Sequence, residues 1–107
     1  MNIQYEAKIR VAAMLFETSK RGIGRVNVMR LTDYTDAETF QFWLPRADWT
    51  FAEWRAVNQE CARQLRQWGF QVKLVHLDMA AYLDWLAGKK LSNSPENRAT
   101  FAASRSL

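Results

Sequence analysis

The sequence predicts an α+β protein in which a small single-layer, three-stranded sheet is packed by two to three helices. One observation is a strongly amphipathic helical pattern over residues 51–68, and a second is the β-branched and aromatic character of the segments that flank it. The chain has 107 residues and is 49% hydrophobic, which is enough for one core. We therefore expect a single domain over residues 1–107, with the approximate order α-β-β-α-β-α and one more short helix.

Two interpretations compete for the N-terminal segment. Apolar and polar residues alternate from Ile3 to Val11, as in a strand, but helix-forming residues dominate residues 6–20, which contain neither Gly nor Pro. We predict a helix that ends near Gly22. Its apolar face would carry Tyr5, Ile9, Ala12, Ala13 and Phe16.

A β-hairpin is predicted next. Apolar side chains alternate with polar ones in residues 25–31 and again in residues 39–44, which is typical of paired strands. The polar, turn-forming residues 32–38 would form the loop between them. Pro45 would end the second strand, because proline has no N–H to donate to a ladder.

The central helix, residues 51–68, has the clearest pattern. Thr50 and Glu53 fit a capping box at its start, and Gly69 followed by Phe70 fits a left-handed turn at its end. Five apolar residues recur at steps of three and four and are expected to be buried: Trp54, Val57, Cys61, Leu65 and Trp68.

A strand and a helix are predicted after it. Residues 70–77 have strand composition, and Asp78 is placed as the N-cap of a helix over residues 79–87 that Gly88 ends. The strand at 70–77 could lie parallel or antiparallel to the one at 39–44. Ser94, Pro95 and Glu96 mark one more short helix, within a tail (residues 89–107) that we expect to dock loosely.

Composition indicates the cellular location and the charge of the partners that we expect. There is one cysteine, so no disulfide can form within the chain, and a reducing, cytoplasmic location is expected. No apolar run approaches the roughly 20 residues of a membrane span, and no signal peptide is recognised. The net charge of +4 favours acidic partners without requiring one.

Catalytic and metal-binding motifs are weak. His76 and Asp78 share a strand face but Asp78 is assigned to capping, and Cys61 belongs to the buried stripe. The acidic cluster in residues 33–38 lacks the spacing of a calcium loop, and the glycines near residue 22 precede a strand rather than a helix. We expect no metal, no cofactor and no enzymatic activity.

The sequence instead favours a binding surface. The face of the central helix opposite its apolar stripe carries arginines, a second basic segment follows the first helix, and two of the five tryptophans have no assigned core position. The candidate partner-binding residues are Arg55, Arg63, Arg66, Trp43, Trp85, Lys20, Arg21 and Arg25.

Three functions are ranked on this basis. The first is a small regulator or inhibitor that acts by protein–protein interaction. The second is a nucleic-acid-binding protein that uses the basic face of helix 51–68 and the 20–30 segment. The third is a small hydrolase centred on His76. Oligomeric state is not predicted.

Overall fold

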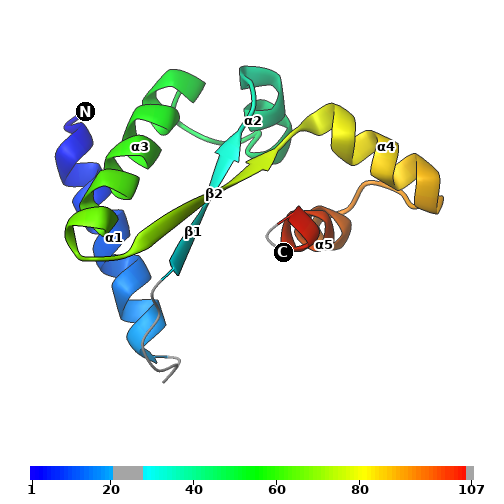
Figure 1. Ribbon diagram of the computed structural model, residues 1–107. Helices are drawn as coiled ribbons and strands as arrows, with labels where there is room; N and C mark the ends of the chain where they lie inside the picture. The colour runs from blue at the N-terminus through cyan, green and yellow to red at the C-terminus, as the bar shows by residue number, and fades with distance from the viewer. Residues whose placement is uncertain (21–27, 106–107) are drawn as a thin grey trace. The chain divides into compact units, whose positions relative to one another are not determined.

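The computed structural model describes residues 1–20 and 28–105, and it confirms the α+β class (Figure 1). The order is α-β-α-α-β-α-α rather than the predicted α-β-β-α-β-α-α. The elements are α1 (Ile3–Lys20), β1 (Val28–Tyr34), α2 (Ala37–Trp43), α3 (Phe51–Gln67), β2 (Gln71–Leu77), α4 (Met79–Lys89) and α5 (Pro95–Arg105).

The predicted hairpin is wrong, and the described residues hold a two-stranded sheet rather than a three-stranded one. Its strands β1 and β2 are adjacent and parallel, so the chain between them forms a crossover (Figure 1). β1 continues to Tyr34, through part of the expected loop at 32–38. Residues 25–27 of the predicted first strand lie outside the described residues.

The predicted strand at 39–44 is instead part of helix α2. The Asp36 carboxylate accepts a hydrogen bond from the Thr39 N–H at 2.7 Å, which caps the helix and lowers the pKa of Asp36. The Leu44 N–H bonds to the Phe40 carbonyl at 2.8 Å. Apolar residues at 40, 43 and 44 fit the helical spacing, whereas those at 40, 42 and 44 fit an alternating pattern, so the segment is compatible with both.

The helical interpretation of the N-terminal segment is confirmed, but its buried face was wrongly assigned. Asn2 caps α1 by accepting a hydrogen bond from the Tyr5 N–H at 3.0 Å. The buried side chains are Ala7 and Val11, whereas the face predicted to be buried is largely exposed, including Tyr5, Ile9 and Phe16. α1 therefore has two apolar faces on opposite sides.

The end of α3 is as predicted. Gly69 has a φ of 92°, the Gly69 N–H bonds to the Arg66 carbonyl at 3.0 Å, and the Phe70 N–H bonds to the Leu65 carbonyl at 3.1 Å. These two bonds define a Schellman turn. The apolar stripe is buried at Trp54, Val57, Cys61 and Leu65, but not at Trp68.

Asp78 caps α4 as predicted, accepting a hydrogen bond from the Ala81 N–H at 3.0 Å. The helix does not end at Gly88. It continues to Lys89, and Lys90 takes the left-handed conformation with a φ of 54°, while the Leu91 N–H bonds to the Leu86 carbonyl at 2.9 Å. α4 thus ends in the same kind of turn as α3, with lysine in the position that glycine prefers.

Because α4 continues past Gly88 and turns at Lys90, two substitutions should stabilise the protein. Gly88→Ala should raise the free energy of unfolding by about 0.5–1 kcal/mol, because Gly88 is helical and a Cβ there meets no atom within 4 Å. Lys90→Gly should raise it by about 1 kcal/mol by relieving the left-handed residue. Gly69→Ala is the opposite control and should destabilise. Denaturant unfolding measures all three, and a lower stability for Lys90→Gly would contradict the assignment.

Helix α5 begins as predicted, with the Ser94 hydroxyl accepting a hydrogen bond from the Asn97 N–H at 3.0 Å. It contributes Phe101, which the sequence pattern did not single out and which is 1% exposed. Phe101 lies among the rings of Trp43, Tyr82 and Trp85, with centroids at 5.3–6.4 Å. The predicted loose docking of residues 89–107 stays a prediction.

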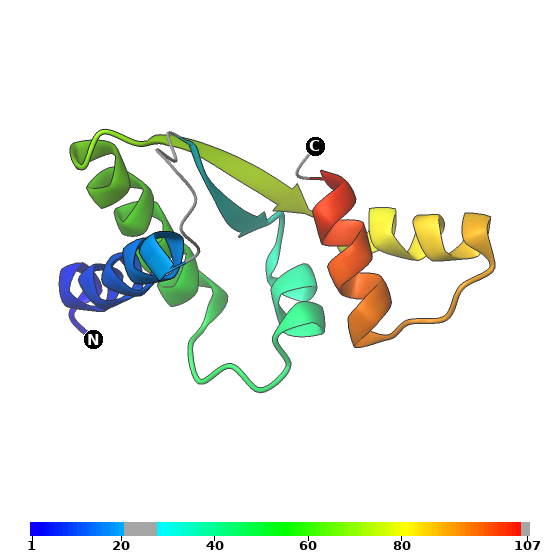
Figure 2. The same ribbon diagram turned by 90° about the horizontal axis from the view of Figure 1, so that it is seen from below.

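The chain divides into two compact units, and the prediction of one domain stays untested. Unit 1 comprises Met1–Leu31 and Ala52–Lys73, and therefore holds α1, nearly all of α3 and the first part of each strand. Unit 2 comprises Thr32–Phe51 and Leu74–Leu107, with α2, α4, α5 and the strand ends. In unit 1, α1 and α3 lie side by side in both views (Figures 1 and 2). In unit 2, α4 contacts both α2 and α5.

Candidate partner-binding site

A groove of about 550 Å³ lies between α1 and α3, entirely within unit 1. α1 supplies most of its length, and the last turns of α3 supply the other wall. The apolar lining residues are Tyr5, Val11, Ala12, Leu15 and Trp68. The polar lining residues are Asn2, Gln4, Lys8, Arg63, Gln64 and Gln67.

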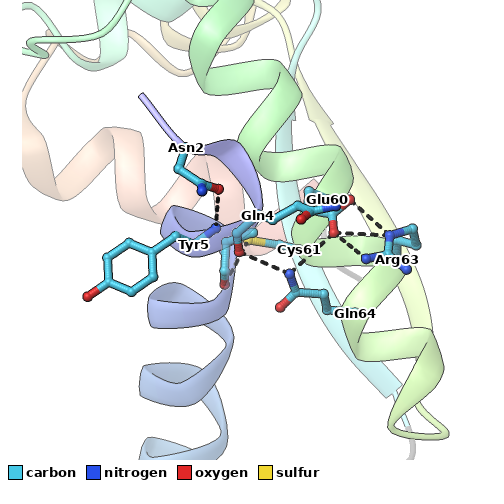
Figure 3. Close-up of polar contacts among 8 residues, drawn as sticks. Asn2, Gln4, Tyr5, Glu60, Cys61, Arg63 and Gln64 are labelled. Atoms are coloured by element: carbon cyan, nitrogen blue, oxygen red, sulfur yellow. Dashed lines mark hydrogen bonds and ion pairs between the residues drawn. The ribbon is translucent and has the colours of Figure 1, made fainter.

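The two helices approach closely because α1 presents small side chains to α3. The Cys61 thiol of α3 lies 3.8 Å from the Ala7 carbonyl oxygen, and burial raises the pKa of this thiol. Farther along, the Gln64 amide donates to the Gln4 carbonyl at 3.2 Å (Figure 3). These contacts fix the floor of the groove.

Two aromatic side chains remain accessible on the groove. Tyr5 is 60% exposed, and Figure 3 shows its ring directed away from α3. Trp68 is 69% exposed, contrary to the prediction that it belongs to the core. α3 ends at Gln67 and the chain reverses at Gly69, so Trp68 lies beyond the last buried residue of the stripe, Leu65.

Arg63 is held by Glu60 on the same helix. Its Nε lies 2.9–3.0 Å from both carboxylate oxygens, and its Nη2 contacts Oε1 (Figure 3). The Glu60 side chain is 15% exposed and that of Arg63 is 51% exposed. The hydrogen bond from Arg63 lowers the pKa of Glu60, and Glu60 in turn raises the pKa of Arg63. Arg63 is therefore paired with a carboxylate of its own helix.

The other predicted binding residues are not gathered at one place. Arg55 and Arg66 are exposed on α3 and are not part of the groove lining. The side chain of Lys20, and all of Arg21 and Arg25, lie outside the described residues. Of the predicted residues whose side chains the structure describes, only Arg63 lines the groove.

The two predicted surface tryptophans are half-buried in unit 2. Both contact Tyr82, with Trp43 at 5.0 Å and Trp85 at 6.1 Å between ring centroids. The Lys89 ammonium lies 5.7 Å from the Trp85 ring. One side of each indole therefore serves the aromatic cluster, which leaves less of it for a partner.

His76 pairs with a residue that the sequence analysis did not connect to it. Its Nδ1 lies 3.1 Å from Oδ2 of Asp33, across the ends of the two parallel strands. Asp78 is occupied by the Ala81 N–H and by the Thr35 hydroxyl at 2.9 Å. Asp33 can orient the imidazole, as in catalytic and metal sites, although the described residues contain no group of three His, Cys, Asp or Glu placed to hold a metal ion.

Most of the groove residues were missed by sequence reasoning. The spacing of Tyr5, Lys8, Ala12 and Leu15 places them on one side of α1, but the sequence does not say which of its two apolar faces meets α3.

Among the described helices, none has the length and apolar character to cross a bilayer. Comparison with protein-family models and with curated proteins finds no match for this chain.

Proposed function

We propose that this chain is a non-catalytic binding module that recognises a partner protein through the groove between α1 and α3. The observation that carries the proposal is the exposure of Trp68 on the lining of a partly apolar groove. Large aromatic side chains left accessible beside a concave apolar surface are the usual anchors of protein interfaces. A regulator or inhibitor that acts by occupying a larger protein fits this arrangement.

The nature of the lining supports binding rather than chemistry. Apolar and amide side chains predominate, and Gln64 is already engaged by Gln4 and Glu60. The nucleic-acid hypothesis remains second. It loses part of its support because Glu60 offsets the charge of Arg63, and phosphate binding depends on uncompensated cations.

Affinity capture tests the proposal. The tagged protein is incubated with lysate of its native cells, with and without nuclease, and bound proteins are identified by mass spectrometry. We expect a partner protein that survives nuclease and whose recovery falls at least about tenfold for Trp68→Ala, as for an interface hot spot. Leu83→Ala, an exposed apolar change in unit 2, is the matched control and should have no effect.

Two outcomes would contradict this function. Recovery that is unchanged by Trp68→Ala would show that the groove is not the binding surface. Recovery that disappears with nuclease would favour the nucleic-acid hypothesis instead.

A further inference from the structure

We propose that the occupant of the groove is an amphipathic helix of the partner protein that carries acidic residues beside its apolar stripe. This inference rests on the proposed function and specifies the chemistry of the partner. It follows from the length of the groove, from the character of its lining and from the sign of its charges.

The length suits a helical segment. The lining residues of α1 within the helix extend from Gln4 to Leu15, which corresponds to about 16 Å at about 1.5 Å per residue. Three turns of a partner helix would cover this distance. A partner helix laid beside α1 and α3 would complete a three-helix contact, which is a recurring mode of peptide recognition.

The lining favours a partner that makes apolar contacts over one that needs hydrogen bonds to its backbone. A helix satisfies its own N–H and C=O groups, so it can pack on Ala12, Leu15 and Trp68 without leaving polar atoms unpaired. An extended segment would need partners for its backbone, and one of the lining amides, that of Gln64, already donates to the Gln4 carbonyl and to Glu60.

The charges of the groove have one sign. The charged lining residues are Lys8 and Arg63, and among residues 1–20 and 28–105 no acidic side chain lines the groove. Arg63 is bound to Glu60, whereas Lys8 is exposed and forms no ion pair with any residue that the structure describes. Lys8 is therefore the cation available to a carboxylate of the partner, and the net charge of +4 would also attract an acidic segment.

Synthetic peptides test this chemistry directly. Three fluorescein-labelled peptides of about 18 residues, long enough to populate a helix, share one Leu/Ala stripe and carry Glu, Gln or Lys beside it. Fluorescence anisotropy should show that the Glu peptide binds at least about tenfold more tightly than the Lys peptide. Lys8→Glu should weaken the Glu peptide about fivefold or more. Lys73→Glu makes the same charge change at an exposed site of unit 1 outside the groove, and should have a much smaller effect.

Each contrary result has a distinct meaning. Equal affinity for the three peptides, or equal effects of Lys8→Glu and Lys73→Glu, would overturn the acidic partner and leave the proposed function standing. Absence of peptide binding, with capture still dependent on Trp68, would overturn the helical partner alone. A dimer in sedimentation that Trp68→Ala abolishes would identify a second copy as the occupant. Recovery of the partner protein that is unchanged by Trp68→Ala would contradict the proposed function itself.

Discussion

Phe101→Ala should lower the free energy of unfolding by about 3–5 kcal/mol. Phe101 is 1% exposed, and its ring contacts three other aromatic side chains of unit 2. Removing it leaves a cavity among rigid rings from α2 and α4, which have little freedom to close around it. Denaturant unfolding, followed by circular dichroism, measures the loss.

The control for this change is Leu83→Ala. Leu83 lies in the same unit but is exposed, so its truncation should cost well under half as much. A loss below about 0.5 kcal/mol for Phe101→Ala would mean that α5 is not held by its aromatic residue. The expectation of a loosely docked tail over residues 89–107 would then be correct.

Leu65→Ala should lower the free energy of unfolding by about 2–5 kcal/mol. Leu65 is fully buried on the α3 stripe, and its carbonyl also accepts the Phe70 N–H in the Schellman turn, so a cavity there lies beside the end of the helix. The same denaturant experiment measures the loss.

Trp68→Ala is the natural comparison for Leu65→Ala, because it removes a larger side chain three residues farther along. Since Trp68 is 69% exposed, the change should alter stability by only about 0.5 kcal/mol. If Trp68→Ala proved as destabilising as Leu65→Ala, the indole would be part of the core, and both its role in the groove and the binding proposal would be wrong.

Helix ends and long amphipathic stretches were predictable because their signals are local. Gly69 and Asp78 act within three or four residues of their position, so their roles could be read without knowing the rest of the fold. Lys90 shows the limit of such reading. Gly88 carries the usual stop signal, but α4 continues past it, and the turn forms at a residue that tolerates it poorly.

The hairpin was mispredicted because residues 39–44 satisfy two periods at once. Asp36 was assigned to a loop, although an aspartate three residues before Thr39, followed by Glu38, is also the start signal of a helix. Once Asp36 caps the helix, the backbone N–H and C=O groups of residues 39–44 bond within α2. They are then not available to pair with β1.

The candidate site was harder to predict than the fold, because it depends on which surfaces meet. The Glu60–Arg63 pair follows from helical spacing and could have been inferred from the sequence. The groove could not, since it requires knowing that α3 packs on Ala7 rather than on Tyr5 and Ile9. The Asp33–His76 pair likewise depends on the register of two strands distant in sequence.

Cys61 allows the rate at which α1 and α3 separate to be measured. It is the only thiol in the chain, it is 1% exposed, and its sulfur faces the Ala7 backbone. A reagent that alkylates thiols can reach it only when the two helices separate, so the labelling rate reports the opening of unit 1 alone. A partner bound across both helices would slow this modification. The labelling rate of Cys61 would therefore report whether the groove is occupied.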